Sequence, residues 1–168
     1  MKLSQTHRQI LFNTVEKVLE EAAFAIVDAP DAEQDGECAP EAEIASAVEF
    51  SGFFAGATAM IAPASLARIF AANMMGLEED DPEADGKMSD ALGELMNMVC
   101  GNLLPQIAGR RPEFEILAPR PIRPEACRRA ADGCPDIHAQ KIRVIVEGRP
   151  AEFFLFVESD LLRGLLND

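Results

Sequence analysis

Apolar residues recur at helical spacing in two parts of the N-terminal half of the chain. Across residues 7–27 they follow one another at steps of three and four, as on one buried helical face, at Ile10, Leu11, Val15, Val18, Leu19, Ala22 and Ile26. A second helix is expected after Pro63, which suits the first helical position because its missing N–H is not needed there. Gly76 suits the end of that helix.

Alternating apolar and polar residues predict strands between and after these helices. A half-buried strand is expected where Ile44, Val48 and Phe50 alternate with glutamates, and a turn within residues 51–56 leads to a second strand that ends near Ile61. Three more strands are expected at residues 113–118, 141–147 and 152–158, the last two as a hairpin across residues 148–150, and a short helix at residues 160–166. Because short links favour antiparallel pairing, we predict one α+β domain over residues 1–168, an antiparallel sheet with helices packed on one face.

Three segments have the composition of exposed loops. Residues 28–43 and 78–90 carry seven acidic residues each, which predicts an exposed loop and a solvated linker. The segment 119–136 is rich in proline and arginine and is expected to be a loop as well. Six arginines, which either complement an acidic partner surface or balance the chain's own acids, lie in and before it, at Arg110, Arg111, Arg120, Arg123, Arg128 and Arg129.

The overall charge excludes several classes of partner. With 15 basic and 29 acidic residues the net charge is -14, and a field of this sign repels nucleic-acid phosphates and anionic lipids. The chain has no Trp and no Tyr, which are the residues used most for base stacking. No stretch approaches the roughly 18 apolar residues of a membrane span, and the N-terminus lacks the pattern of a signal peptide. Four scattered cysteines do not form a disulfide framework, so we expect a cytoplasmic protein.

A third helix is expected to be capped by Ser89 or Asp90 and to run to about residue 108. With about 100° between successive residues, its buried face comprises Leu92, Leu95, Met96, Val99 and Leu103. The opposite side carries a narrow stripe at positions i, i+4, i+7 and i+11, which we call the polar stripe: Asp90, Glu94, Asn97 and Gly101. A carboxylate and a carboxamide thus stand about one turn apart and point away from the core.

Two glycines and a proline distinguish this helix from an ordinary exposed one. Polar residues on an exposed face need no functional explanation, but Gly93 and Gly101 each cost up to about 1 kcal/mol relative to alanine inside a helix. Their presence indicates that something approaches this face closely. Pro105 is expected to strain the last turn at the Gly101 carbonyl.

On these residues the sequence resembles the CheC/CheX/FliY phosphatases, which dephosphorylate the chemotaxis response regulator CheY. Their signature is Asp or Ser, three residues, Glu, two residues, Asn, 21 or 22 residues, and Pro. The chain matches it with Asp90, Glu94, Asn97 and, after 21 intervening residues, Pro119. The flanking residues 93–102 (GELMNMVCGN) resemble the CheX helix, and residues 50–76 resemble the strand-strand-helix unit before it, so that the resemblance runs from about residue 44 to Pro119.

The resemblance is to the single-site members of the family. CheC-type proteins carry the Glu-Asn motif in two helices, whereas in the first helix here Asn13 is preceded by Ile10 and not by a glutamate. This arrangement is that of CheX. The resemblance therefore implies a CheC/CheX-like α+β fold and a homodimer.

The resemblance also implies a reaction, the hydrolysis of the aspartyl phosphate on a CheY-like receiver domain in chemotaxis or two-component signalling. Asn97 would orient the attacking water, and Glu94 would pair with a lysine of the receiver; both are candidate catalytic residues. Asp90, Glu94 and Gly101 are candidate partner-binding residues. The Mg²⁺ ion is carried by the phosphorylated receiver, so the protein is expected to have no metal or cofactor of its own.

A second function class fits the same residues. The intact Asp90, Glu94 and Asn97 favour catalysis, whereas Pro105, beside the polar stripe, favours a non-catalytic CheX-like binding module that docks a receiver domain or a signalling complex. Phosphate release from a loaded receiver distinguishes the two.

The cysteines carry weaker signals. Cys127, Cys134 and His138 could be three zinc ligands, but their spacing matches no common zinc pattern, so an ordinary loop is favoured. Cys100 has no histidine near it in sequence, which argues against a nucleophile.

Overall fold

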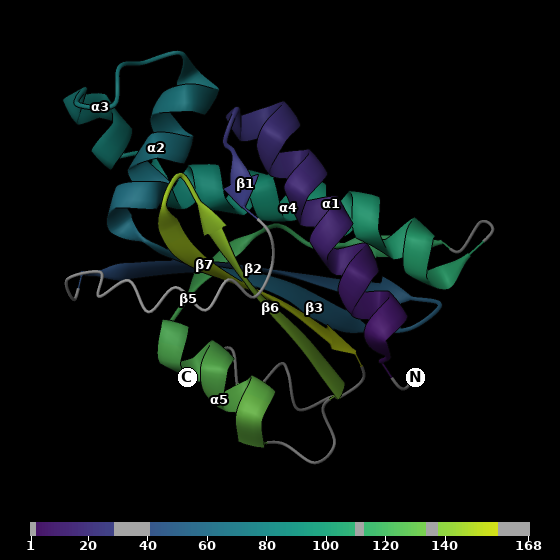
Figure 1. Cartoon of the computed structure of the whole chain (residues 1–168). Helices are drawn as coiled ribbons and strands as arrows, with labels where there is room; N and C mark the ends of the chain where they lie inside the picture. The colour runs from purple at the N-terminus through teal and green to yellow at the C-terminus, as the bar shows by residue number, and fades with distance from the viewer. Residues whose placement is uncertain (1–2, 29–40, 110–112, 134–137, 158–168) are drawn as a thin grey trace.

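The computed structural model describes residues 3–28, 41–109, 113–133 and 138–157. In this part of the chain a seven-stranded antiparallel sheet forms the centre of the fold, with helices on both of its faces (Figure 1). The elements in chain order are α1 (Gln5–Ala23), β1 (Val27–Asp28), β2 (Glu43–Gly52), β3 (Gly56–Pro63), α2 (Ala64–Met75), α3 (Pro82–Asp85), α4 (Met88–Ala108), β4 (Phe114–Ile116), β5 (Arg120–Ile122), α5 (Pro124–Gly133), β6 (His138–Val146) and β7 (Arg149–Val157).

Two short strands share one edge of the sheet. The strand order is β1-β6-β7-β3-β2-β4, and β5 also pairs with β2. Residues 45–47 of β2 pair with β5, and residues 50–52 pair with β4. Residues 117–119, which we call the connector, join β4 to β5 along this edge.

The predicted hairpin between the last two strands is confirmed, with a tighter turn than expected. β6 and β7 pair along their whole length, and only Glu147 and Gly148 lie between them. Both residues have positive φ angles, 50° and 72°, as the two central residues of a type I′ turn require. This turn matches the natural twist of the two strands.

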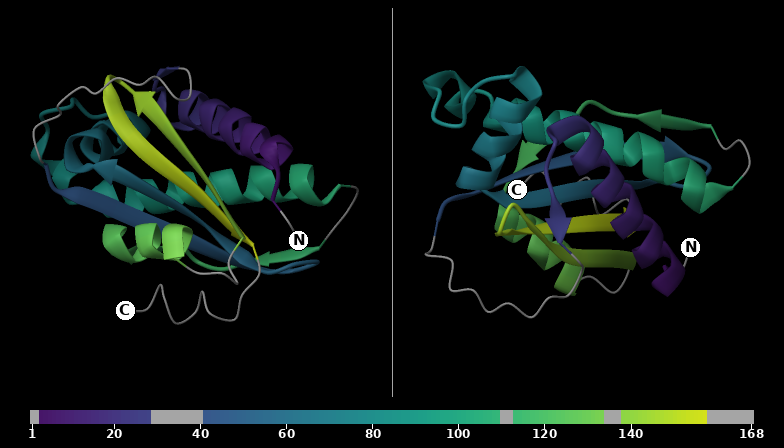
Figure 2. Two further views of the ribbon diagram at one scale, coloured as in Figure 1. Left: turned by 60° about the horizontal axis from the view of Figure 1, so that its bottom comes forward. Right: turned by 45° about the horizontal axis from the view of Figure 1, so that its top comes forward.

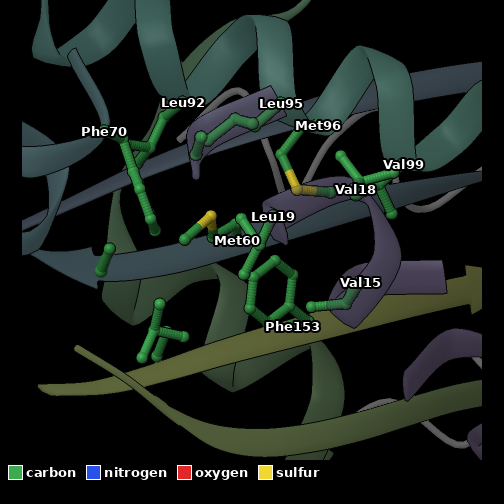
Figure 3. Packing of buried hydrophobic residues seen from close by; sticks show 14 of the residues in the cluster. Val15, Val18, Leu19, Met60, Phe70, Leu92, Leu95, Met96, Val99 and Phe153 are labelled. Atoms are coloured by element: carbon green, nitrogen blue, oxygen red, sulfur yellow. The ribbon is translucent and has the colours of Figure 1, made fainter. Parts of the chain in front are cut away.

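The larger core lies between the sheet and the helices α1, α2 and α4, which cover one face (Figure 2). Figure 3 shows Met60 of β3 and Phe153 of β7 lying beneath Leu95 and Met96 of α4. All four side chains are fully buried. Burying one such side chain contributes about 1.5–3 kcal/mol, so α4 is held in place mainly by its apolar side.

The opposite face of the sheet is covered by α5, where the sequence predicted a loop (Figure 2). Cys127 and Ala130 of this helix are buried against Ala45 and Ala47 of β2. The middle of β2 is therefore buried on both faces and is not half-buried as expected. The α+β class and the antiparallel sheet are confirmed, but the helices do not all gather on one face, since α5 is on the other.

The loop prediction failed because the apolar side of α5 is made of small residues. Ala126, Cys127 and Ala130 follow helical spacing, but they lie among prolines and arginines that suggested an exposed loop. Small residues suffice here because they pack against the alanines of β2 and the ring of Phe154.

Several helix boundaries differ from the predicted ones. α1 ends at Ala23, with Phe24 at a left-handed C-cap, so that Ile26 lies beyond the helix and is 68% exposed instead of buried. Pro63 is the N-cap of α2 and not its first residue, whereas Gly76 ends that helix as expected, with φ of 67°.

The acidic segment 78–90 is more ordered than a linker. It contains α3, whose N-cap Asp81 accepts a hydrogen bond from the Glu83 backbone N–H at 2.9 Å. Ala84 is buried and Asp85 pairs with Arg68 of α2. α4 then begins at Met88, earlier than the predicted caps at residues 89–90. The predicted loop at 29–40 and the helix at 160–166 lie outside the described residues.

Candidate functional site

The polar stripe lies on the outer side of α4. Asp90, Glu94 and Gly101 are exposed and Asn97 is half-buried. The other side of the helix is fully buried, as the periodicity predicted, at Leu92, Leu95, Met96, Val99 and Leu103. The structure thus holds a carboxylate and a carboxamide on a rigid helix, three residues apart and on neighbouring positions of its surface.

The functional groups of the stripe are available to a partner. The only ion pair of the stripe within the described residues joins the Asp90 carboxylate to the Lys87 ammonium at 3.8 Å, and Asp90 keeps 78% of its side chain exposed. Such a surface pair contributes little to stability. Within the described parts of the chain the side chains of Glu94 and Asn97 make no hydrogen bond or ion pair. Their polar groups can therefore be used in recognition without breaking an internal contact.

Pro119 lies directly beside the stripe. A Cβ atom placed on Gly93 would be 3.2 Å from both the Cβ and the Cγ atoms of Pro119. Gly93 precedes Glu94 and is four residues before Asn97, so its position is about 40° around the helix from Asn97. The two parts of the sequence motif, which 21 intervening residues separate in the chain, are therefore neighbours in the fold.

The two glycines of the helix have different surroundings. The close approach indicated by Gly93 is confirmed, and the approaching residue belongs to the chain itself. Around Gly101, in contrast, a Cβ atom would meet nothing within 4 Å. No contact within the described chain accounts for a glycine at position 101, and its proposed partner-binding role remains a prediction.

Pro105 leaves the motif part of α4 undisturbed. The helix continues past it to Ala108, and the Gly109 backbone N–H donates to the Pro105 carbonyl at 3.2 Å. The proline lies eight residues after Asn97, about two turns away. It therefore does not alter the geometry of Glu94 and Asn97, which weakens the argument from Pro105 for a non-catalytic module.

The described cysteines are buried. Burial raises the pKa of the Cys100 thiol to about 11 and that of Cys127 to about 12, so both are protonated at neutral pH and neither is an activated nucleophile. Cys134 lies outside the described residues, and the described ones contain no group of three His, Cys, Asp or Glu side chains placed to hold a metal. The expectation of a protein without its own metal stays a prediction.

The arginine-rich segment partly balances the chain's own acids. Arg120 pairs with Glu49, and Arg128 pairs with both Glu43 and Glu152. Arg123 and Arg129 are exposed, and the remaining two of the six, Arg110 and Arg111, lie outside the described residues.

Two residues of β2 that the sequence analysis missed contact Arg120 of β5, at the edge of the sheet beside the connector. The Ser46 hydroxyl donates to the Arg120 carbonyl at 3.3 Å, and Glu49 pairs with the Arg120 side chain. Nothing in the local spacing links residues 46 and 49 to residue 120. Glu49 was recognised only as the polar side of a strand.

No helix in the described ranges is long and apolar enough to cross a membrane.

Comparisons with solved structures identify the fold. A chemotaxis protein CheX from Desulfovibrio desulfuricans superposes with a TM-score of 0.66 at 16% identity, covering 91% of this chain and 99% of that one. A CheX–CheY–BeF3–Mg complex from Borrelia burgdorferi gives 0.63 at 17% identity, with 90% and 97% covered. A CheC-like superfamily protein from Shewanella sp. PV-4 gives 0.62 at 19% identity, with 94% and 100% covered.

Sequence comparison defines the family. No curated protein matches the chain in sequence. The family model described as chemotaxis phosphatase CheX matches residues 44–139, a range that contains the polar stripe, Pro119 and α5. Because this match covers more than half of the chain, the protein belongs to the family of the chemotaxis phosphatase CheX.

Proposed function

We propose that this protein is a phosphatase that hydrolyses the aspartyl phosphate of a CheY-like receiver domain. The observation that carries the proposal is the exposed pair Glu94 and Asn97 on a rigid helix, with Pro119 packed beside it against Gly93. All residues of the family signature are present and lie together at one surface. The Borrelia burgdorferi structure, a complex of CheX with CheY, supports a receiver as the partner.

Asn97 orients the nucleophile in this proposal. Hydrolysis of an acyl phosphate needs a water held in line with the phosphorus and a site closed to other water. The Asn97 carboxamide has both a donor and an acceptor for that water, but it is too weak a base to deprotonate it. The water oxygen bonds to phosphorus as the bond to the aspartate oxygen breaks, which releases inorganic phosphate and the free aspartate.

Glu94 anchors the partner. Its exposed carboxylate, free of internal contacts within the described residues, forms a charge-assisted pair with the active-site lysine of the receiver. This contact places α4 over the phosphorylated aspartate and brings Asn97 within reach of the phosphorus. Asp90 and Gly101 extend the same contact surface along the helix.

Phosphate release from a receiver domain loaded with acetyl phosphate and Mg²⁺ tests the proposal. We expect substoichiometric amounts of the protein to accelerate the loss of phosphate over many turnovers. Binding of the receiver without any acceleration would contradict the phosphatase assignment and favour the non-catalytic binding module.

Replacement of Gly101 by alanine should stabilise the protein and weaken its partner binding. Alanine is the better helix former by up to about 1 kcal/mol, and its Cβ atom meets nothing within 4 Å. The added methyl group lies on the surface that we propose for docking, so the KM for the receiver should rise. Urea unfolding and saturation kinetics measure the two effects.

Gly86→Ala is the matched control for Gly101→Ala. Gly86 lies at the end of α3, outside the stripe, with φ of -70° and its nearest neighbour 3.8 Å from an added Cβ atom. This variant should leave the KM unchanged. An unaltered KM in Gly101→Ala would remove Gly101 from the docking surface.

Activity is expected to be independent of any metal bound by this protein. A variant with Cys127→Ala, Cys134→Ser and His138→Ala should dephosphorylate the receiver at close to the parent rate. Alanine is chosen at Cys127 because the thiol is buried against the sheet, where a hydroxyl would lack a partner.

Metal analysis of the purified protein accompanies this variant. We expect less than about 0.1 zinc per chain, since a structural site of typical affinity would be filled. Stoichiometric zinc, together with unfolding of the triple variant, would contradict the prediction. Magnesium is kept in every assay because the receiver requires it.

A further inference from the structure

The connector is an exposed apolar segment beside the polar stripe. Leu117 is 42% exposed, and Ala118 and Pro119 are also exposed. Because Pro119 meets Gly93, one turn before Asn97 on the helix, any partner that covers Glu94 and Asn97 also comes close to the connector.

The connector contains a β-bulge. Phe50 of β2 pairs with Ile116 of β4, and Ala47 of β2 pairs with Arg120 of β5. Two residues of β2 therefore lie opposite three residues of the edge strand. A bulge of this kind bends the strand and re-aims a side chain, and it commonly occurs at sheet edges next to active sites. Here the extra residue lies in the connector, whose Pro119 is next to Gly93 of α4.

Three contacts with β2 hold the bulge in place. The Leu117 backbone N–H donates to the Glu49 carbonyl at 2.9 Å, and the Ser46 hydroxyl donates to the Arg120 carbonyl at 3.3 Å. The Arg120 Nε and Nη2 atoms both donate to Oε1 of Glu49, the former at 3.1 Å. Glu49 thus binds the connector on both sides, through its backbone before Pro119 and through its side chain after it.

The ion pair lies on the sheet face that α5 covers, since Glu49 points to the same side as Ala47 and Arg120 is directly opposite Ala47. The side chains of Arg120 and Glu49 are only 30% and 19% exposed, so solvent screens their attraction less than that of a fully exposed pair. The contact with Gly93 is equally restrictive, since a Cβ atom at 3.2 Å would force the proline ring to move by a few tenths of an ångström.

We propose that Glu49 and Arg120 are positioning residues of the receiver-docking surface. From the α5 side of the sheet their ion pair fixes the backbone of the bulge, so that Pro119 seats against Gly93 and the connector forms a fixed apolar wall next to Glu94 and Asn97. The inference rests on the proposed function. A surface that is already in its bound position loses less conformational freedom on binding. The pair therefore acts on affinity for the receiver and not on the chemical step, because the reacting groups sit on α4.

Kinetics of three variants test this role: Arg120→Gln, Glu49→Gln and the double variant. Each should raise the KM for the phosphorylated receiver and the Kd for the receiver activated with beryllofluoride about five- to tenfold, with kcat within about twofold of the parent. The double variant should be no worse than Arg120→Gln alone, because that single change already removes the pair with Glu49. Arg120→Lys, which keeps the charge but not the paired donors, should recover part of the affinity.

Arg128→Gln is the matched control. Arg128 also pairs with carboxylates, those of Glu43 and Glu152, on the same α5-covered face of the sheet as Glu49 and Arg120, but it does not contact the connector. If loss of an internal ion pair acted only through general destabilisation, this variant would raise the KM equally. We expect its KM to equal that of the parent, and an equal rise would overturn the proposal.

Gly93→Ala tests the contact with Pro119 in a variant whose substitution favours the helical conformation. Alanine is the better helix former, but its Cβ atom displaces Pro119, so the KM should rise although the helix is not weakened. An unchanged KM in Gly93→Ala would contradict the seating of Pro119.

Hydrogen exchange of the protein alone tests whether the ion pair fixes the bulge in the absence of a partner. In Arg120→Gln and Glu49→Gln, the amides of Leu117 and Arg120 should exchange at least about tenfold faster, whereas those of α4 keep their protection. Unchanged exchange at the connector would contradict the proposal that the ion pair fixes the bulge.

Absence of both binding and turnover in the parent protein would instead refute the proposed function, and with it the docking role, whatever the exchange shows. Normal parent activity with parent-like KM in all variants would refute the positioning role alone.

Discussion

Replacement of Asn97 by alanine is expected to lower kcat for receiver dephosphorylation by about two orders of magnitude while the fold and the docking remain nearly intact. A loss of this size is typical when one positioned polar group is removed from a catalytic site. The fold should tolerate the change because the side chain is only half-buried and has no hydrogen bond within the described residues to lose. Single-turnover phosphate release, together with the Kd for a beryllofluoride-activated receiver, separates the two effects.

Asn102→Ala is the matched control for this experiment. Asn102 is an exposed asparagine of the same helix, but its side chain donates to the Met98 carbonyl at 2.8 Å and it lies outside the polar stripe. This variant should retain the parent rate. If Asn97→Ala also keeps most of its activity, Asn97 does not orient the water.

Replacement of Glu94 by alanine should weaken both receiver binding and turnover, each by about ten- to a hundredfold. The reason is that the carboxylate pairs with a lysine in an interface from which water is excluded, where loss of one partner leaves the other charge uncompensated. Glu94→Gln keeps the shape and removes the charge, so it should be nearly as damaging. Saturation kinetics report KM and kcat separately.

Glu125→Gln is the charge control for Glu94. Glu125 is an exposed carboxylate on α5, which lies on the opposite face of the sheet from α4. The same loss of one negative charge there should change neither KM nor kcat. An unaltered KM in Glu94→Ala would contradict the role of Glu94 in binding the receiver, even if kcat fell.

Elements with a strong local signal could be predicted from the sequence. The periodicity of α1 and α4, the stop at Gly76 and the hairpin of β6 and β7 all depend on neighbouring residues. α5 and α3 could not be predicted in this way. The small apolar residues of α5, such as Ala130, become a core face only when the alanines of β2 lie opposite them. α3 occupies an acidic segment in which only Ala84 is buried.

The sequence by itself determined the composition of the candidate site. Helical periodicity assigns Asp90, Glu94, Asn97 and Gly101 to the outer side of α4, because the apolar residues of the same helix leave only that side to solvent. Motif spacing then indicated the family, and the match over residues 44–139 confirmed it.

Only the tertiary structure decided how the site is built. The contact of Gly93 with Pro119 depends on how α4 crosses β2, and the bulge depends on a one-residue change of register between β4 and β5. Neither is encoded in a local pattern, because both join segments that are far apart in the chain and meet only when the sheet is assembled. For the same reason Glu49, which in the sequence is one more polar residue of a strand, becomes the partner of Arg120 at the connector only in the folded protein.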